Sequence, residues 1–159
     1  MSNILLPEFK KMLLLLKKHD VDFLLIGGYA VIYYGYDRVT GDMDIWLDAT
    51  KDNKIKLCKA LNEFGINEES IKKVKKLNFE ETHFFYFGQK PQKIDFLTKV
   101  NLINFKEAFE MANYFPLQNQ QIPVIHYEHL ILTKISNKRS KDKTDIEELQ
   151  RILKYRKNS

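Results

Sequence analysis

Hydrophobic positions recur along the chain with two periods, one typical of amphipathic helices and one typical of strands. The helical period predicts helices over residues 7–18, 27–34, 50–64, 68–76, 104–113, 127–136 and 142–153. Short apolar and aromatic runs predict strands over residues 22–26, 42–47, 82–87 and 93–97, and extended segments over 115–117 and 122–125. Helices and strands that alternate in this way are typical of an α/β or α+β fold. We therefore expect a mixed twisted sheet with flanking helices that lie largely on one face, in which residues 1–100 form the core and residues 101–159 a mainly helical C-terminal part of one compact unit.

The same pattern predicts which side of two helices faces the core. In the helix over residues 50–64, Ile55, Cys58 and Leu61 fall on one stripe, because positions three apart share a helix face. A core position also suits Cys58, the one cysteine of the chain, which has no partner for an internal disulfide. In the last helix, the residues predicted to point inward are Ile146, Leu149, Ile152 and Leu153.

The strand predicted over residues 42–47 carries two acidic side chains, Asp42 and Asp44, among apolar ones. Because side chains alternate across a strand, both project from the same face, and Trp46 shares that face as a pocket wall or as a packed core residue. Two neighbouring carboxylates repel each other, and their burial without a partner is costly. A divalent cation makes such a pair favourable. Mg²⁺ or Mn²⁺ prefers carboxylate oxygens and leaves positions for substrate phosphate and water.

Two glycines, Gly27 and Gly28, follow the apolar strand over residues 22–26. Glycine allows the backbone to turn sharply and allows a ligand to approach the main chain closely. The N–H groups that open the next helix would then point at an anion. A phosphate-binding turn that precedes a metal-binding acidic pair indicates a nucleoside triphosphate bound with its metal.

The loop between these two features contains Arg38 and Thr40. Arg38 could form a surface ion pair with Asp37 or Asp48. Alternatively, its guanidinium group contacts the triphosphate, whose oxygens match the fork of N–H donors. The position of the loop just before Asp42 favours the phosphate contact.

The segment that carries all these residues reads GGYAVIYYGYDRVTGDMDIWLD. It resembles the signature of the nucleotidyltransferase (polymerase-beta-like) superfamily, in which Gly-Gly is followed, after a spacer, by Asp-x-Asp between apolar residues. The local sequence is most similar to small bacterial nucleotidyltransferases related to abortive-infection and toxin–antitoxin proteins. This resemblance implies a Mg²⁺-dependent enzyme that moves a nucleoside monophosphate from an NTP to an acceptor hydroxyl and releases pyrophosphate. It also implies that Gly27, Gly28, Arg38 and Thr40 bind the nucleotide.

The strand over residues 93–97 contains a lone acid, Asp95, in the run Ile-Asp-Phe-Leu. A carboxylate that faces solvent on a half-exposed strand is one interpretation, although its apolar neighbours argue against it. A position beside the strand of Asp42 and Asp44 would bring the three acids together. The resemblance implies a third carboxylate on such a strand, which accepts the proton of the attacking hydroxyl or completes a second metal site. We therefore assign Asp95 to catalysis and metal binding together with Asp42 and Asp44.

Lys134 is a base within the apolar helix over residues 127–136. Its simplest interpretation is a lysine whose stem lies on the protein while its ammonium reaches solvent. Small toxin-like relatives carry a comparable lysine, followed by a cluster of basic residues and aspartates and by a last helix. This resemblance implies that Lys134 contacts the triphosphate, and that Asp142 or Asp145 orients Lys134 or caps the last helix.

The chain has 26 basic and 21 acidic residues, a net charge of +5, with basic clusters near residues 72–76, 138–143 and 151–157. A solvated surface explains such clusters, and so does a polyanionic partner. The acceptor is accordingly expected to be RNA or tRNA, or a protein, with a small molecule such as an antibiotic as the alternative. The resemblance adds an antitoxin as a partner. A further alternative is a regulator that binds nucleotide or RNA without turnover.

The chain, with 159 residues and 44% hydrophobic content, can bury one sizeable core. Its longest apolar run, residues 13–16, is far shorter than the ~20 residues that span a bilayer. The N-terminal sequence lacks a basic leader and a cleavage site of small residues. We therefore expect a cytoplasmic protein that does not bind membranes.

Overall fold

A computed structural model describes residues 1–81 and 83–159, so Thr82, at the start of a predicted strand, lies outside the described residues. The N-terminal elements are α1 (Pro7–Lys18), β1 (Phe23–Ile26), α2 (Gly27–Tyr33), β2 (Met43–Leu47), α3 (Lys51–Phe64) and α4 (Glu68–Lys76). They are followed by β3 (Phe84–Phe87), β4 (Ile94–Leu97), α5 (Phe105–Glu110), β5 (Asn113–Leu117), β6 (Gln120–Val124), α6 (Tyr127–Asn137) and α7 (Ser140–Lys157).

The strands form one mixed sheet in the order β3-β4-β2-β1-β6-β5. β2 runs antiparallel to β1 and parallel to β4, and β6 runs parallel to β1. β3–β4 and β5–β6 are antiparallel hairpins at the two edges. The predicted α/β class with a mixed sheet is therefore confirmed, and the hairpin from residues 113–124 joins the same sheet as the N-terminal strands.

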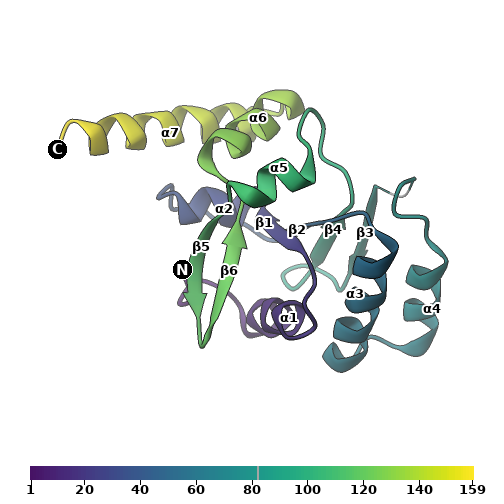
Figure 1. Ribbon diagram of the computed structural model, residues 1–159. Coiled ribbons are helices and arrows are strands. Elements are labelled where there is room, and N and C mark those ends of the chain that lie inside the picture. The colour runs from purple at the N-terminus through teal and green to yellow at the C-terminus, as the bar shows by residue number, and fades with distance from the viewer. Residues whose placement is uncertain (82) are drawn as a thin grey trace.

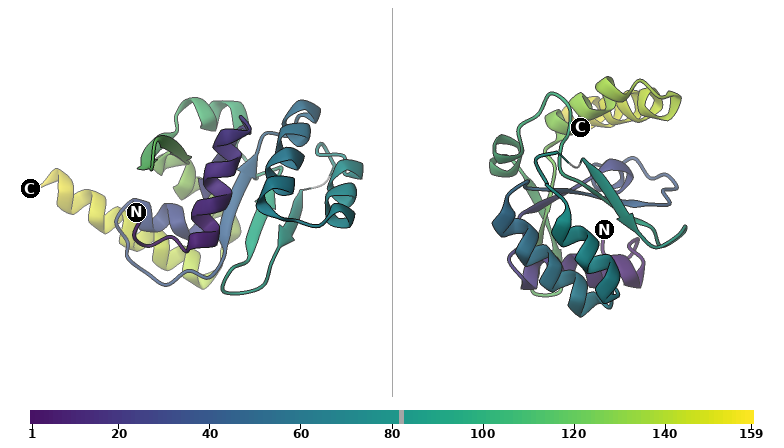
Figure 2. Two further views of the ribbon diagram at one scale, coloured as in Figure 1. Left: turned by 90° about the horizontal axis from the view of Figure 1, so that it is seen from below. Right: turned by 90° about the vertical axis from the view of Figure 1, so that its right-hand side faces the viewer.

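Helices cover both faces of the sheet, so the expectation that they lie largely on one face is wrong. α1, α3 and α4 lie on one side, and α6 and α7 lie on the other (Figures 1 and 2). α5 lies on the side of α6 and α7, because the buried ring of Trp46 on β2 packs edge-on against Phe105 of α5, with ring centroids 5.2 Å apart. Trp46 and Asp44 are two residues apart on β2 and therefore share a face of the sheet. Asp44 thus lies on the side of the sheet that α5, α6 and α7 cover.

Asn53 ties β1 and β2 together at the ends opposite Asp44. Its buried side chain accepts a hydrogen bond from the backbone N–H of Asp22 and donates to the carbonyl oxygens of Asp22 and Asp48. α3 begins with the Thr50 hydroxyl accepting from the N–H of Asn53 and ends at Gly65, whose φ of 107° is left-handed. These bonds fix the strand that carries the acidic pair.

Three sequence-based predictions about helices are wrong in detail. Ile55 is 56% exposed, because α3 packs through Leu57, Cys58 and Leu61 instead. The helix predicted over residues 104–113 ends at Glu110, since Asn113 already pairs in β5. In α7, Leu149 is buried, Leu153 is exposed, and the buried positions of the first turns are aspartates.

No helix among the described residues is both long enough and apolar enough to cross a membrane.

Candidate active site

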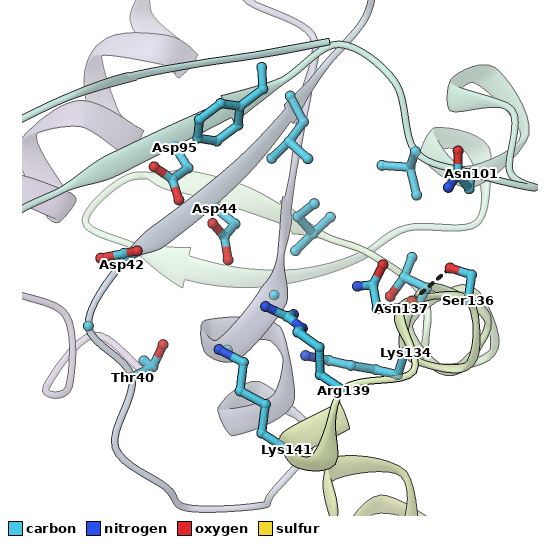
Figure 3. Close-up of a pocket in the computed structure, with 18 of the residues that line it drawn as sticks. Thr40, Asp42, Asp44, Asp95, Asn101, Lys134, Ser136, Asn137, Arg139 and Lys141 are labelled. Atoms are coloured by element: carbon cyan, nitrogen blue, oxygen red, sulfur yellow. Dashed lines mark hydrogen bonds between the residues drawn. The ribbon is translucent and has the colours of Figure 1, made fainter. Parts of the chain in front are cut away.

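Three carboxylates lie together at one end of the central strands. β2 and β4 are paired so that Asp44 is directly opposite Asp95. Asp42 stands just before β2, and Figure 3 shows Asp42, Asp44 and Asp95 lining one wall of a cavity. The predicted neighbourhood of Asp95 and the acidic pair is therefore confirmed.

The environment of Asp44 disfavours its negative charge. Burial, together with the nearby carboxylates of Asp95 and Asp42, raises the pKa of Asp44 to about 7, against an opposing effect of Lys134. The Oδ1 atom of Asp42 is buried, and no hydrogen bond to it is found within residues 1–81 and 83–159. The ammonium of Lys93 lies 3.1 Å from Asp95 Oδ1 and 3.8 Å from Asp42 Oδ2. Lys93 thus forms ion pairs with two of the three acids.

The glycine pair is packed against this site. Gly27 has a φ of +67°, and a Cβ atom there would collide with the carboxylate of Asp44. A Cβ atom at Gly28 would collide with Thr40. Side chains at either position would displace residues of the site, so the close approach requires glycine. Gly27, Gly28 and Thr40 all line the cavity, as a nucleotide-binding role requires.

Arg38 lines the same cavity but pairs with neither Asp37 nor Asp48, the two partners considered from the sequence. Its Nε atom lies 2.8 Å from Asp145 Oδ1, and its Nη2 donates to Asp145 Oδ2 at 3.0 Å. Arg38 thus joins the first third of the chain to α7. A contact with the triphosphate stays a prediction.

Lys134 is buried rather than extended to solvent. Its ammonium lies 3.2 Å from Asp142 Oδ1 and 3.0 Å from Asp145 Oδ2. Both aspartates therefore orient Lys134, and neither caps α7, whose N-cap position is Arg139. Burial acts to raise the pKa of Asp142, but the hydrogen bond from Arg139 and the charge of Lys134 outweigh it and lower the pKa below its ordinary value.

The cavity has a volume of about 560 Å³ and is bounded by opposite charges. In Figure 3, Lys134, Arg139 and Lys141 extend from α6 and α7 toward the carboxylates. Other lining residues were not singled out from the sequence: Phe84, Lys90, Lys99, Asn101 and Asn137. The sequence indicated the basic wall of Lys134, Arg139 and Lys141 through Lys134 itself and through the basic run over residues 138–143. The five lining residues just named follow no sequence pattern that would have marked them.

The acidic wall suits a divalent cation. A buried oxygen of Asp42 without a hydrogen bond and an Asp44 carboxyl with a raised pKa both gain from a bound positive charge. Within the described part of the chain, no three His, Cys, Asp or Glu side chains form a complete metal-binding cluster. Mg²⁺ needs no such cluster, because it is commonly held by one or two carboxylates together with water and substrate phosphates.

Comparisons with known proteins agree with this geometry. A family described as "Nucleotidyl transferase of unknown function (DUF2204)" matches residues 6–159. The fold is similar to that of a "putative nucleotidyltransferase" from Thermotoga maritima, with a TM-score of 0.58 and 15% identity over 94% of this chain and 91% of that chain. It is also similar to the lincosamide antibiotic adenylyltransferase LnuA in its lincomycin-bound structure, with a TM-score of 0.51 and 17% identity over 91% of this chain and 96% of that chain. No curated protein sequence is significantly similar to this chain.

The two structural likenesses concern the fold, since their identities are low. The family match covers almost the whole chain and includes every candidate residue of the cavity. This chain belongs to the nucleotidyl transferase family DUF2204.

Proposed function

We propose that this protein is a Mg²⁺-dependent nucleotidyltransferase that moves a nucleoside monophosphate from an NTP to an acceptor hydroxyl. One observation carries the proposal: Asp44 and Asp95 lie side by side on parallel strands, next to Asp42, in a cavity whose opposite wall is basic. The acids supply oxygen ligands for a cation, and the basic wall supplies charges for a polyphosphate. Both are needed for phosphoryl-type chemistry, which depends on positioning and charge stabilisation.

Asp42 and Asp44 would hold Mg²⁺, with Asp95 beside them as the proton acceptor and as a further ligand. When bound, Mg²⁺ offsets the charge of the phosphate oxygens and favours ionisation of the attacking hydroxyl. The acceptor oxygen forms a bond to the α-phosphorus as the bond from that phosphorus to the bridging oxygen of the β-phosphate breaks. The hydroxyl proton passes to Asp95, and pyrophosphate leaves.

The pyrophosphate half of the NTP fits the β1–α2 turn. Gly27 and Gly28 leave the main chain open to phosphate oxygens, and Thr40 adds a hydroxyl donor. Lys134 faces this region with its ammonium already oriented by two aspartates. An ammonium held in place before substrate binds needs little reorganisation as negative charge develops.

The acceptor class is open to the three possibilities named from the sequence, namely RNA or tRNA, a protein, or a small molecule. The fold neighbour LnuA is an adenylyltransferase for lincosamide antibiotics, which is an instance of the third class on a similar fold. The exposed aromatic rings of Phe84 and Tyr86 beside this chain's own site favour a different acceptor.

The test uses purified protein, Mg²⁺ and each α-labelled NTP with a mixture of RNA and small-molecule acceptors. Asp44→Asn is expected to lower transfer by about 10²- to 10³-fold, the usual cost of removing one preorganised electrostatic group. Asp48→Asn is a matched control, because this acid lies just past the end of the same strand but outside the cavity.

Label transfer by the wild type and by Asp48→Asn, but not by Asp44→Asn, would support the proposal. Equal transfer by Asp44→Asn, or transfer without a divalent cation, would overturn it. Tight metal-dependent NTP binding without pyrophosphate release with any acceptor would identify instead a nucleotide-binding regulator with the same fold.

A further inference from the structure

The edge strand β3 presents two aromatic rings to solvent. Its sequence is Phe-Phe-Tyr-Phe, and the side chains alternate between its two faces. The rings of Phe85 and Phe87 pack against Phe96, with centroids 5.3 and 6.1 Å apart. The rings of Phe84 and Tyr86 point to the other face, where the two residues are 49% and 55% exposed. Two large exposed rings side by side call for an explanation.

These rings lie on the same face of the sheet as the acids. Tyr86 is directly opposite Asp95 in the β3–β4 pairing, and directly opposite residues project to the same side. The centroids of Phe84 and Tyr86 are 6.0 Å apart, with their planes inclined by 34°. Phe84 also lines the cavity. The pair thus extends the cavity as an open ledge beyond Asp95.

Lysines surround this ledge. The ammonium of Lys93 lies over both rings, 4.7 Å from the centroid of Tyr86 and 5.7 Å from that of Phe84. Lys90 and Lys99 are exposed residues on the rim of the cavity. A surface with flat apolar rings among positive charges is complementary to a stacked base and its phosphates.

The order of the strands sets which substrate meets the ledge. From β1 to β3, the cavity passes from Gly27 and Gly28, over Asp44, to Asp95 and then the aromatic pair. In nucleotidyl transfer the attacking and leaving oxygens lie roughly in line. With pyrophosphate at the glycine turn, the acceptor therefore approaches from the side of β3.

The solvent exposure of Phe84 and Tyr86 favours some classes of acceptor over others. A drug-sized molecule usually has most of its surface buried in its pocket, which half-exposed rings on an edge strand do not provide. A peptide that adds to an edge strand binds through its backbone and needs no rings on the face of the sheet. Stacking on exposed aromatic side chains within a basic surface is the typical mode for single-stranded nucleic acid.

We propose that Phe84 and Tyr86 form a stacking platform for the 3′-terminal base of a single-stranded nucleic acid, whose terminal ribose hydroxyl is the acceptor at Asp95. The proposal rests on the proposed nucleotidyl transfer. The new bond joins the 3′-terminal oxygen to the α-phosphorus of the NTP as the bond from that phosphorus to the bridging oxygen of the β-phosphate breaks. The hydroxyl proton passes to Asp95, and pyrophosphate leaves. RNA and DNA share the stacking base, and the test separates them.

The test measures the Kd of 5′-fluorescein-labelled single-stranded oligonucleotides by fluorescence anisotropy, without NTP and without divalent cation. RNA and DNA of the same sequence are compared, each with a normal or an abasic 3′-terminal nucleotide. The variant is the double substitution Phe84→Ala and Tyr86→Ala. Tyr114→Ala is the matched control, because Tyr114 is 47% exposed on β5 at the opposite edge of the sheet. Tyr86→Phe keeps the ring and is expected to bind like the wild type.

The double variant is expected to bind a normal oligonucleotide about 10- to 100-fold more weakly, the range for loss of base stacking. The abasic 3′ end should weaken binding to the wild type by a similar factor and leave binding to the double variant unchanged. Equal losses for RNA and DNA would support recognition by the base alone, and binding of RNA alone would support added recognition of the ribose. Unchanged affinity of the double variant, or no penalty for the abasic end, would overturn the proposal.

Two further outcomes separate this proposal from the proposed function. Base-dependent binding at the platform without nucleotidyl transfer by the wild type would refute the enzyme activity and keep the site. Transfer to an acceptor with the same KM in the double variant and the wild type would keep the activity and refute the platform. Conversion of a wild-type dimer to a monomer by the double substitution, with unchanged oligonucleotide affinity, would assign the rings to a contact between copies and overturn the proposal.

Discussion

Two groups of buried or half-buried aspartates, one on the sheet and one on α7, differ in their partners. On α7, Asp142 pairs with Lys134 at 3.2 Å and with Arg139 at 2.7 Å, while Asp145 pairs with Lys134 at 3.0 Å and with Arg38 at 2.8 Å. On the sheet, Lys93 lies near Asp95 and Asp42, and no ion pair with Asp44 is found among the described residues.

The pKa values follow this difference. The cations around Asp142 lower its pKa, whereas burial and two neighbouring acids raise the pKa of Asp44 to about 7. Burial of a carboxylate therefore does not by itself indicate a functional site. A buried carboxylate without enough positive charge around it is the better indicator, because a substrate or a metal ion can supply that charge. The α7 aspartates pair with Lys134, Arg139 and Arg38, and the sheet aspartates are the ones that we propose to bind the metal ion.

The comparison predicts first that loss of an α7 aspartate is a stability defect. Asp145→Ala leaves Arg38 without its carboxylate partner and Lys134 with Asp142 alone, and is expected to lower the free energy of unfolding by about 3–5 kcal/mol, as when one member of a buried ion pair is removed. Urea denaturation followed by circular dichroism measures this change.

The control is Glu148→Ala on the same helix, which removes the solvent-exposed pair with Arg151 and should cost about 1 kcal/mol or less. If both substitutions lowered the free energy of unfolding equally, burial of the α7 ion pairs would add nothing to stability. The contrast between the two groups of aspartates would then be wrong.

The sequence predicts the sheet group better than the α7 group. Period-two alternation was enough to place Asp42 and Asp44 on one face, and the resemblance to nucleotidyltransferases supplied Asp95. The exact pairing of Asp44 with Asp95 depends on β4 lying parallel beside β2, although β3 comes between them in the chain. Local patterns predict such elements but do not determine their order in a sheet.

The α7 group was predictable in part, because the resemblance implied that Asp142 or Asp145 orients Lys134, but nothing in the sequence indicated the ion pair with Arg38. A helix rule places aspartates toward solvent, yet Asp145 is buried because Arg38, 107 residues earlier, reaches it. Such a partner cannot be found from periodicity. The aromatic pair of β3 is similar, since alternation puts Phe84 and Tyr86 on one face but does not reveal that this face adjoins the acids.

The second prediction concerns pH. In the folded protein Asp44 keeps its proton up to about pH 7, whereas in the unfolded chain it loses the proton near its ordinary pKa of 3.8. Between these values the folded state binds more protons, so the free energy of unfolding falls as pH rises, by at most about 1.4 kcal/mol per pH unit. For Asp142 the sign is opposite, and its stabilisation is lost only as pH falls below its ordinary value of 3.8.

Asp44→Asn should therefore remove the decline between about pH 4 and pH 7 and leave the loss of stability at lower pH in place. Urea denaturation of both proteins at several pH values across this window measures the difference. Parallel curves would mean that Asp44 ionises in the folded protein as it does in the unfolded chain.

The smallest expected effect concerns Lys93, the one cation shared by Asp95 and Asp42 in the described structure. Its ammonium lies against oxygens that we propose to bind the metal ion, so we expect the metal ion and the lysine to compete. Lys93→Met keeps an apolar stem beside Phe84 and Tyr86 but removes the charge. Because solvent screens this pair, Mn²⁺ is expected to bind more tightly by about 5-fold at most, measured by electron paramagnetic resonance without NTP.

Lys56→Met is the control, because it removes a Lys–Asp pair of the same 3.1 Å length outside the cavity. Weaker Mn²⁺ binding by Lys93→Met would show that Lys93 supports metal binding and does not compete with it. The sheet aspartates would then lack less positive charge than their few ion pairs indicate.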